Sequence, residues 1–252
     1  MPDQDLNEKQ KLEKQFEDIA ASIFGMYLSQ FRRSVQQDRG VPPASLTYQD
    51  FRFSLDRHYR RTQNVFRSLV FEGIDPVEEN GEAQDLFDSS MDAWRKRVSE
   101  ERAALISETN VLEAEESLKR AAEDIEAAGE VATPFALAAL SSLSLKRKFD
   151  QRKKLISVME TQAAAESTKF LKTEAITNTP VLMRGFLTFK NWHTRIDGRE
   201  RPSHHNANNQ ERPAAEAFQV GGSKLQYPGD PSAPIRETAK CRCYITSKVV
   251  PI

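Results

Sequence analysis

The stretch from residue 83 to residue 128 contains no glycine or proline, and it constrains the fold most, because it predicts one long helix. Within it Val98, Leu105 and Leu112 fall seven residues apart, the spacing of a coiled-coil seam. The next step of this repeat falls on Lys119, and the apolar line moves to other positions. The break in the repeat favours a helix packed within a bundle over a long free coiled coil.

Three further helices are predicted, at residues 6–37, 47–71 and 135–178, with segments containing glycine or proline between the predicted helices. Charged residues make up 29% of the chain and apolar residues only 38%, which suits an extended, helix-rich protein better than a compact globule with a thick core. Residues 1–170 are therefore expected to form an extended, mainly α-helical region with long helices.

The composition changes after Pro180, where aromatic, β-branched, glycine and proline residues become frequent. Residues 182–196 predict one or two strands, the sequence around Gly221 predicts a hairpin, and residues 241–250 predict a last strand. We therefore expect a small, turn-rich α+β module at residues 171–252, and the fold class of the whole chain is predicted to be α+β.

The net charge is -1, so no global excess of positive charge marks the chain as nucleic-acid-binding. The two cysteines, Cys241 and Cys243, are so close in sequence that a disulfide between them would be strained, and we expect reduced thiols and an intracellular origin. The N-terminus is polar, which argues against a signal peptide. The most apolar stretch, residues 131–145, is too short to span a bilayer and contains Pro134, so a soluble protein without a membrane partner is expected.

The segment from residue 193 to residue 210 holds three of the four histidines. Alternate residues of a strand point to the same side, so Cys241 and Cys243 could bind one metal ion together. The residues that could complete a tetrahedral zinc site are His204 or His205, with His193 or Asp197. The spacing matches no standard zinc signature, and the alternative is a pair of buried thiols that pack as small hydrophobic groups.

Two other interpretations of this segment stay open. A cysteine with a histidine and an aspartate could form a nucleophilic triad, although no familiar hydrolase motif surrounds these residues. The simplest interpretation is structural, because Asp197, Arg199 and Arg201 alternate and could hold the loop together through Asp–Arg pairs.

Two basic helical stretches could contact DNA phosphates or the acidic surface of a partner. The residues concerned are Arg57, Arg60, Arg61, Lys146, Lys153 and Lys154. The alternative is an ordinary solvated helix face.

Uncommon residues follow one another at set spacings in the C-terminal part of the chain: KNW, DGRERPSH, FQV, YPGDP and KCRC. In this order and spacing the chain resembles the phage head morphogenesis (minor head protein) family, also called Mu F-like. Upstream, KTEAITN resembles a helix of that family, with Lys172 in place of the usual arginine. Asn209 stands where glycine is common, and Lys240 stands where asparagine precedes the cysteine. The residues that carry the resemblance are Lys190, Trp192, Asp197, Arg199, Arg201, His204, Phe218, Tyr227, Gly229, Asp230, Cys241, Arg242 and Cys243. The resemblance does not call for His193 or His205, so the expected metal ligands narrow to His204, Cys241 and Cys243 with a fourth ligand that the sequence does not name.

The resemblance implies a non-catalytic minor capsid protein at the portal vertex of a tailed phage or prophage, acting in head assembly, in DNA packaging and delivery, or in both. It implies the portal protein as partner, with major capsid protein, scaffold protein and double-stranded DNA as further candidates. The expected locations are the capsid interior of the virion and, during assembly, the host cytoplasm. The competing hypotheses are a phage-encoded enzyme or effector, such as a nuclease or transferase using the His/Cys cluster, and a DNA-binding module acting through the basic helices.

Overall fold

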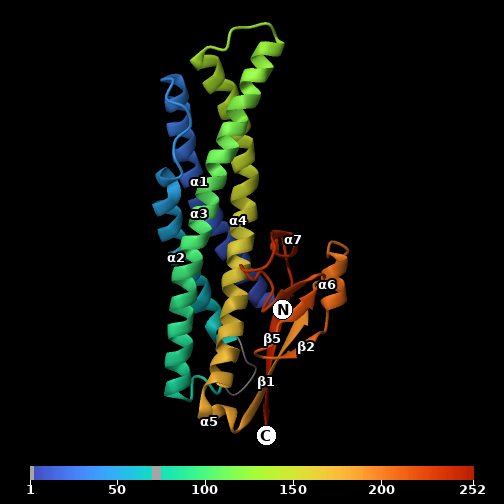
Figure 1. The fold of residues 1–252 in the computed structure, drawn as a ribbon. Coiled ribbons are helices and arrows are strands. Elements are labelled where there is room, and N and C mark those ends of the chain that lie inside the picture. The colour runs from blue at the N-terminus through green and yellow to red at the C-terminus, as the bar shows by residue number, and fades with distance from the viewer. Residues whose placement is uncertain (1–2, 70–74) are drawn as a thin grey trace. The chain divides into compact units, whose positions relative to one another are not determined.

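The computed structural model describes residues 3–69 and 75–252. Its long helices are α1 (Asp3–Gln36), α2 (Ser45–Phe66), α3 (Gly81–Ala127) and α4 (Pro134–Asn178), and a short 3-10 helix, η1 (Arg67–Leu69), follows α2 (Figure 1). The four predicted helices are confirmed to within a few residues, except that residues 70 and 71 of the second lie outside the described residues.

The C-terminal part carries short elements around a small sheet. They are α5 (Pro180–Met183), β1 (Phe186–His193), α6 (Pro202–Ala207), β2 (Glu211–Pro213), β3 (Phe218–Val220), β4 (Ser223–Leu225), α7 (Ile235–Thr238) and β5 (Tyr244–Pro251). Strands β2, β1 and β5 form an antiparallel sheet in that order, with Trp192 opposite Ile245. The predicted hairpin is confirmed, since β3 and β4 pair around Gly221, whose φ of 58° suits glycine. The α+β fold class, with long N-terminal helices and a small C-terminal strand module, is confirmed.

The chain forms two compact units, and each of the four long helices contributes residues to both. One unit comprises residues 1–12, 58–96 and 158–252, and the other comprises residues 13–57 and 97–157. The predicted division into a helical region at residues 1–170 and a C-terminal module at residues 171–252 stays a prediction.

The unit formed by residues 13–57 and 97–157 is a helical bundle with an aromatic centre. The ring of Phe24 in α1 stacks on Phe149 of α4 at 4.4 Å and meets Phe51 of α2 edge-on at 5.4 Å. Thr47 of α2 donates a hydrogen bond to Ser107 of α3 at 3.0 Å. These contacts join all four long helices, as the interrupted repeat of residues 83–128 predicts.

The buried face of α3 in this bundle is not the seven-residue line of leucines. Val98 is fully buried, but Leu105 is 50% exposed and Leu112 is 64% exposed. The seven-residue line is therefore not a packing seam, which agrees with the packing within a bundle expected from the break in the repeat. The residues buried instead recur at steps of three and four and are mostly small or polar: Ile106, Asn110, Ala114, Ser117, Ala121 and Ile125.

The C-terminal half of α4 is buried on all sides from residue 160 to residue 173. Its polar side chains are used to hold β5, because buried polar groups need hydrogen-bond partners. Gln162 Nε2 donates to the carbonyl oxygen of Cys243 at 2.6 Å, and a carboxylate oxygen of Glu166 accepts from the backbone N–H of Ile245 at 2.8 Å. The start of β5 is thereby fixed against α4, and with it the position of the two cysteines.

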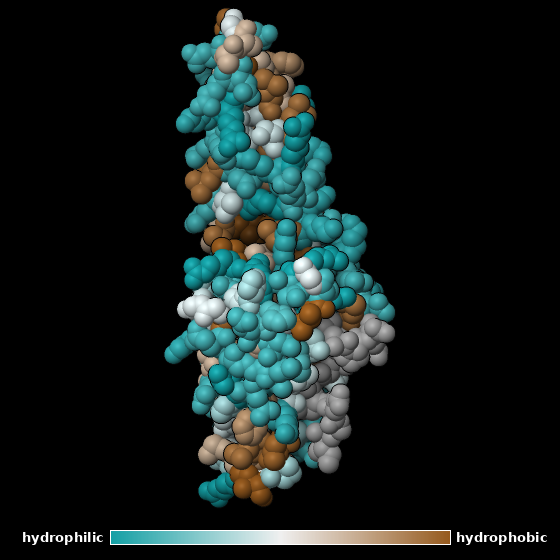
Figure 2. Space-filling view, turned by 90° about the vertical axis from the view of Figure 1, so that its right-hand side faces the viewer, coloured by the Kyte–Doolittle hydropathy of each residue, from teal (hydrophilic) through white to brown (hydrophobic). Residues whose placement is uncertain are grey.

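The face drawn in Figure 2 is largely hydrophilic, with small separate groups of hydrophobic residues. Among the helices that the structure describes, none combines the length and the apolar character needed to cross a bilayer.

The buried His58 is expected to make the stability of the protein sensitive to acid. It lies buried in α2 with Nε2 2.9 Å from Thr161 Oγ1, and burial, followed by the nearby charge of Arg61, lowers its pKa to about 3. A histidine whose pKa is depressed in the folded state is protonated first in the unfolded state, so stability falls as the pH drops below about 6.5. We expect the wild type to lose about 2–3 kcal/mol more than His58→Gln between pH 7 and pH 4.5. Urea unfolding at the two pH values measures this, and equal losses would contradict it.

Candidate metal centre

His204, Cys241 and Cys243 come together in the C-terminal part of the chain. His204 lies in α6, which begins with Pro202 at its first turn, and the two cysteines directly precede β5. His204 Nδ1 is 3.3 Å from Cys243 Sγ and 3.6 Å from Cys241 Sγ, and the three potential ligand atoms all lie within 4.8 Å of one another. Zinc–sulfur bonds of about 2.3 Å and zinc–nitrogen bonds of about 2.0 Å in a tetrahedron place N and S roughly 3.5 Å apart, so the group could hold one metal ion.

The two thiols differ in their tendency to ionise. A hydrogen bond with Cys241 is the main cause that lowers the pKa of Cys243, and contacts with His204 and Thr194 add to it. The pKa of Cys241 is raised, first by the same pair interaction and then by burial. Cys243 is therefore the cysteine that ionises more readily, and cysteine sulfur with imidazole nitrogen is a donor set that suits zinc.

A small cavity opens beside these ligands. It has a volume of about 20 Å³, and its wall includes Thr194, Arg199, Lys240 and the three ligand residues. A space of that size holds one water molecule, which is enough for a fourth metal ligand, whereas a drug-sized substrate needs a pocket of a few hundred Å³.

The other residues predicted to complete the metal site do not join the group. His193 Nε2 is 2.7 Å from Thr246 Oγ1, and the His193 ring stacks on Tyr244. His205 lies 3.7 Å from Glu200, and Asp197 pairs with an arginine. Within residues 3–69 and 75–252, the group therefore offers three protein ligands.

The loop before α6 is held by arginines, but not in the pairs expected. Asp197 accepts two hydrogen bonds from Arg242, which stands between the cysteines, and this contact is the main cause that lowers the Asp197 pKa to about 2. Arg199 contributes its backbone N–H to Asp197 at 3.2 Å, and the guanidinium of Arg201 donates to the carbonyl oxygen of Ala239. Asp–Arg pairing does hold the loop, through Arg242 in place of Arg199 and Arg201.

Trp192 and the YPGDP segment form the framework around the site. Trp192 is fully buried and meets the rings of Phe218 and His204 edge-on, with centroids 5.3 and 5.9 Å away. Tyr227 accepts a hydrogen bond from Trp94 Nε1 at 2.8 Å. Asp230 accepts from the backbone N–H groups of residues 226 and 232.

Gly229 allows this segment to approach α4 closely. Its φ is 82°, and a Cβ there would lie 3.0 Å from Gln162 Cγ and 3.3 Å from the backbone nitrogen of Ala163. Only glycine fits such a position without displacement of its neighbours. The predicted motif residues are therefore packing, turn and hydrogen-bonding residues of one compact unit.

The sequence interpretation missed two residues that contact His204. Glu237 of α7 places a carboxylate oxygen 3.3 Å from His204 Nε2. Thr194 donates its hydroxyl to the His204 carbonyl oxygen at 2.6 Å, and it accepts from Trp192 Nε1 and, at 3.6 Å, from Cys243 Sγ. An acidic residue among so many others, and a threonine after a strand, carry no signal that single-sequence reasoning could use.

The basic residues predicted to contact DNA or a partner lie on helices. Arg57, Arg60 and Arg61 of α2 are exposed. Lys146 and Lys153 both pair with Asp150, at 2.7 and 3.2 Å. A solvated, internally paired helix face accounts for those two lysines, and a contact with DNA or a partner through this set, including Lys154, stays a prediction.

The geometry of the three ligands, and not a likeness to a characterised protein, is what points to metal chemistry. Comparisons with protein-family models, with curated proteins and with solved structures found no match to this chain.

Proposed function

We propose that this chain is a minor head protein of a tailed phage or prophage, associated with the portal vertex and acting in head assembly, DNA packaging and delivery, or both. The observation that supports the proposal is the burial of most of the resemblance-carrying residues, although Asp197 and Arg199 are exposed. Trp192, His204, Phe218, Cys241 and Cys243 are each at most 3% exposed. A catalytic motif would line an open cleft, whereas these residues hold a small module together.

The experiment compares the assembly of phage heads with and without the gene that encodes this chain. A phage or prophage that encodes the chain is induced, and purified heads are probed for the protein together with portal protein. The proposal expects the chain in heads at low copy number and defective heads or reduced packaging after deletion. Its presence only in the free fraction of the lysate, with normal heads formed without it, would contradict the proposal.

We also propose that the His204, Cys241 and Cys243 group binds one zinc ion, with a water molecule in the adjacent cavity as fourth ligand. The ion would tie α6 to the start of β5, and its role would be structural. It would supply folding energy because the unfolded chain has no preformed site.

Removal of the metal is therefore expected to destabilise the protein. With zinc at 100–1000 times its dissociation constant, chelation should cost about 3–4 kcal/mol of unfolding free energy. Metal analysis should find one zinc per chain in the wild type and none in Cys241→Ser. His205→Ala is the matched control, because this neighbouring histidine is outside the group and should leave zinc bound. A metal-free wild type purified in the presence of zinc would contradict this.

A second candidate function is a cysteine-dependent enzyme, favoured by one observation. The imidazole of His204 lies between a cysteine and a carboxylate, with Nδ1 3.3 Å from Cys243 Sγ and Nε2 3.3 Å from a carboxylate oxygen of Glu237. In a catalytic triad Cys243 would be the nucleophile, His204 the base and Glu237 the acid that orients the base. Modification of DNA or protein by the purified chain that disappears in Cys243→Ser would support it. No activity with wild-type protein in zinc-free buffer would exclude it for the substrates tested.

A further inference from the structure

Each ring nitrogen of His204 faces a different partner. Nδ1 faces the two sulfurs, and Nε2 lies 3.3 Å from an oxygen of Glu237, whose residue is only 7% exposed. A histidine that ligates a metal through one nitrogen commonly donates its other N–H to a carboxylate, which fixes the tautomer and the orientation of the ring.

We propose that Glu237 is the positioning residue of the metal centre. This inference rests on the zinc site proposed above. Glu237 accepts the Nε2–H of His204, so the Nδ1 lone pair points at the metal position between Cys241 and Cys243. Without this carboxylate the neutral imidazole could also carry its proton on Nδ1, the form that cannot bind the ion.

Two side chains besides His204 contact the carboxylate of Glu237. Ser203 of α6 donates its hydroxyl to Oε2 at 3.1 Å, and Arg236 of α7 lies 3.5 Å from Oε1. Gly221, in the β3–β4 turn, lies close to both Ser203 and Glu237. A Cβ at this position would lie 3.3 Å from Glu237 Oε1 and 3.1 Å from Ser203 Cβ. A buried carboxylate is costly unless it is partnered, so this placement fits a group with a specific task.

The side chains of His204 and Glu237 are close, but their geometry is not that of a hydrogen bond. The distance suits an ion pair, yet His204 Nε2 is a buried nitrogen whose N–H makes no hydrogen bond of good geometry with any described residue. A small rotation of the ring that brings Nδ1 onto a metal ion would also turn Nε2–H. We infer that metal binding completes this hydrogen bond, and that part of the metal affinity comes from it.

The test compares zinc affinities by competition with a chromophoric chelator. Glu237→Gln keeps the shape of the side chain and removes its charge, and we expect zinc to bind about 10–100-fold more weakly than to wild type. Glu237→Asp should recover part of the loss. Glu200→Gln is the matched control, because Glu200 lines the same cavity but pairs with His205, and its zinc affinity should equal that of wild type.

Cobalt substitution gives a second readout that a merely structural role would not move. Both cysteines remain in Glu237→Gln, so the thiolate-to-cobalt charge-transfer band should persist while the band positions of the ligand field shift with the imidazole. Equal affinity and identical cobalt spectra in wild type and Glu237→Gln would overturn the inference and leave the zinc site standing. No zinc binding by wild type and by Glu200→Gln would overturn both.

A folding defect in Glu237→Gln would be seen by circular dichroism, and a milder variant then decides. Ser203→Ala removes only the hydroxyl that holds Glu237 Oε2. A folded Ser203→Ala protein with a severalfold weaker affinity for zinc supports the positioning role, and an unchanged affinity overturns it.

Discussion

Replacing Trp192 with alanine is expected to lower the free energy of unfolding by about 3–5 kcal/mol. The indole is fully buried, packs edge-on against Phe218 and His204, and donates a hydrogen bond to Thr194 at 3.2 Å. Its removal leaves a cavity that the short strands β1 and β5 cannot close. Urea unfolding monitored by circular dichroism measures the change.

Two further variants separate this packing from the general effect of truncating a side chain on β1. Leu187 lies on the same strand but is 51% exposed, so Leu187→Ala should lower the free energy of unfolding by less than about 1 kcal/mol. Trp192→Phe keeps most of the apolar volume, so its loss of stability should be larger than that of Leu187→Ala and smaller than that of Trp192→Ala. A loss in Trp192→Ala no larger than that in Leu187→Ala would show that the indole is not the centre of the module.

The long helices could be predicted because glycine and proline mark where they end, and the hairpin because Gly221 supplies a positive φ. The buried face of α3 could not, since periodicity was judged from the largest apolar residues. In the structure Leu105 and Leu112 are exposed, whereas Ala114 and Ser117 are fully buried. Side-chain size alone is therefore a poor guide to the packed face of a long, highly charged helix.

The three candidate metal ligands could be proposed from residue type and from the alternation of the cysteines. The contact of Glu237 with His204 could not, because it depends on how α6 and α7 meet. Asn209 has a φ of 62° and Lys240 a φ of 55°, so both residues lie in the left-handed region that glycine and asparagine favour.

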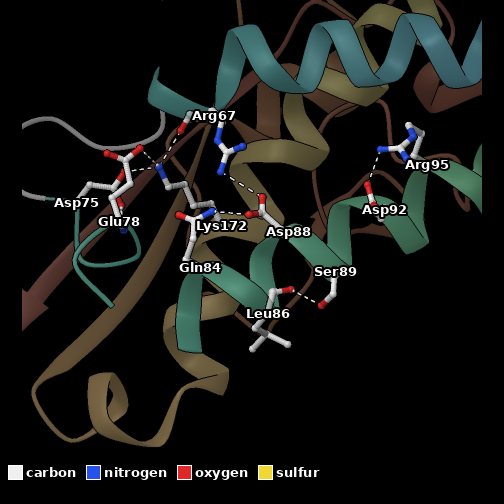
Figure 3. A network of polar contacts seen from close by, with 10 residues as sticks. All are labelled: Arg67, Asp75, Glu78, Gln84, Leu86, Asp88, Ser89, Asp92, Arg95 and Lys172. Carbon is white, nitrogen blue, oxygen red and sulfur yellow. Dashed lines mark hydrogen bonds and ion pairs between the residues drawn. The ribbon is translucent and has the colours of Figure 1, made fainter. Parts of the chain in front are cut away.

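Lys172 gives the second large expected effect. It is fully buried in α4, and its Nζ donates to the carbonyl oxygen of Arg67 at 2.7 Å, to Asp75 and to Glu78 at 3.4 Å (Figure 3). Asp75 in turn accepts the backbone N–H of Val77 at 3.1 Å. One ammonium group thus joins the end of α2 and the segment before α3 to α4.

Lys172→Met should cost about 3 kcal/mol, the lower end of the range for breaking a buried ion pair, because it leaves Asp75 and the Arg67 carbonyl without their cation. Glu78 adds little, since its side chain is 54% exposed. Lys172→Arg, which restores a cation with more donors, should cost less than Lys172→Met. Lys119→Met, at a lysine whose side chain is 78% exposed, is the matched control and should change stability by at most about 0.5 kcal/mol.

The pairing itself is measured by a double-mutant cycle with Asp75→Asn. If Lys172 acts mainly on the Asp75 charge, the double variant should be about 1–3 kcal/mol more stable than the sum of the single losses predicts, because neither change then leaves a lone charge behind. Additive losses would assign the effect to the hydrogen bond with the Arg67 carbonyl and to the contact of the ammonium group with the ring of Phe87, whose centroid lies 5.8 Å from Nζ. In that case any loss of stability in Asp75→Asn alone would come from its other contacts, such as the hydrogen bond from the backbone N–H of Val77.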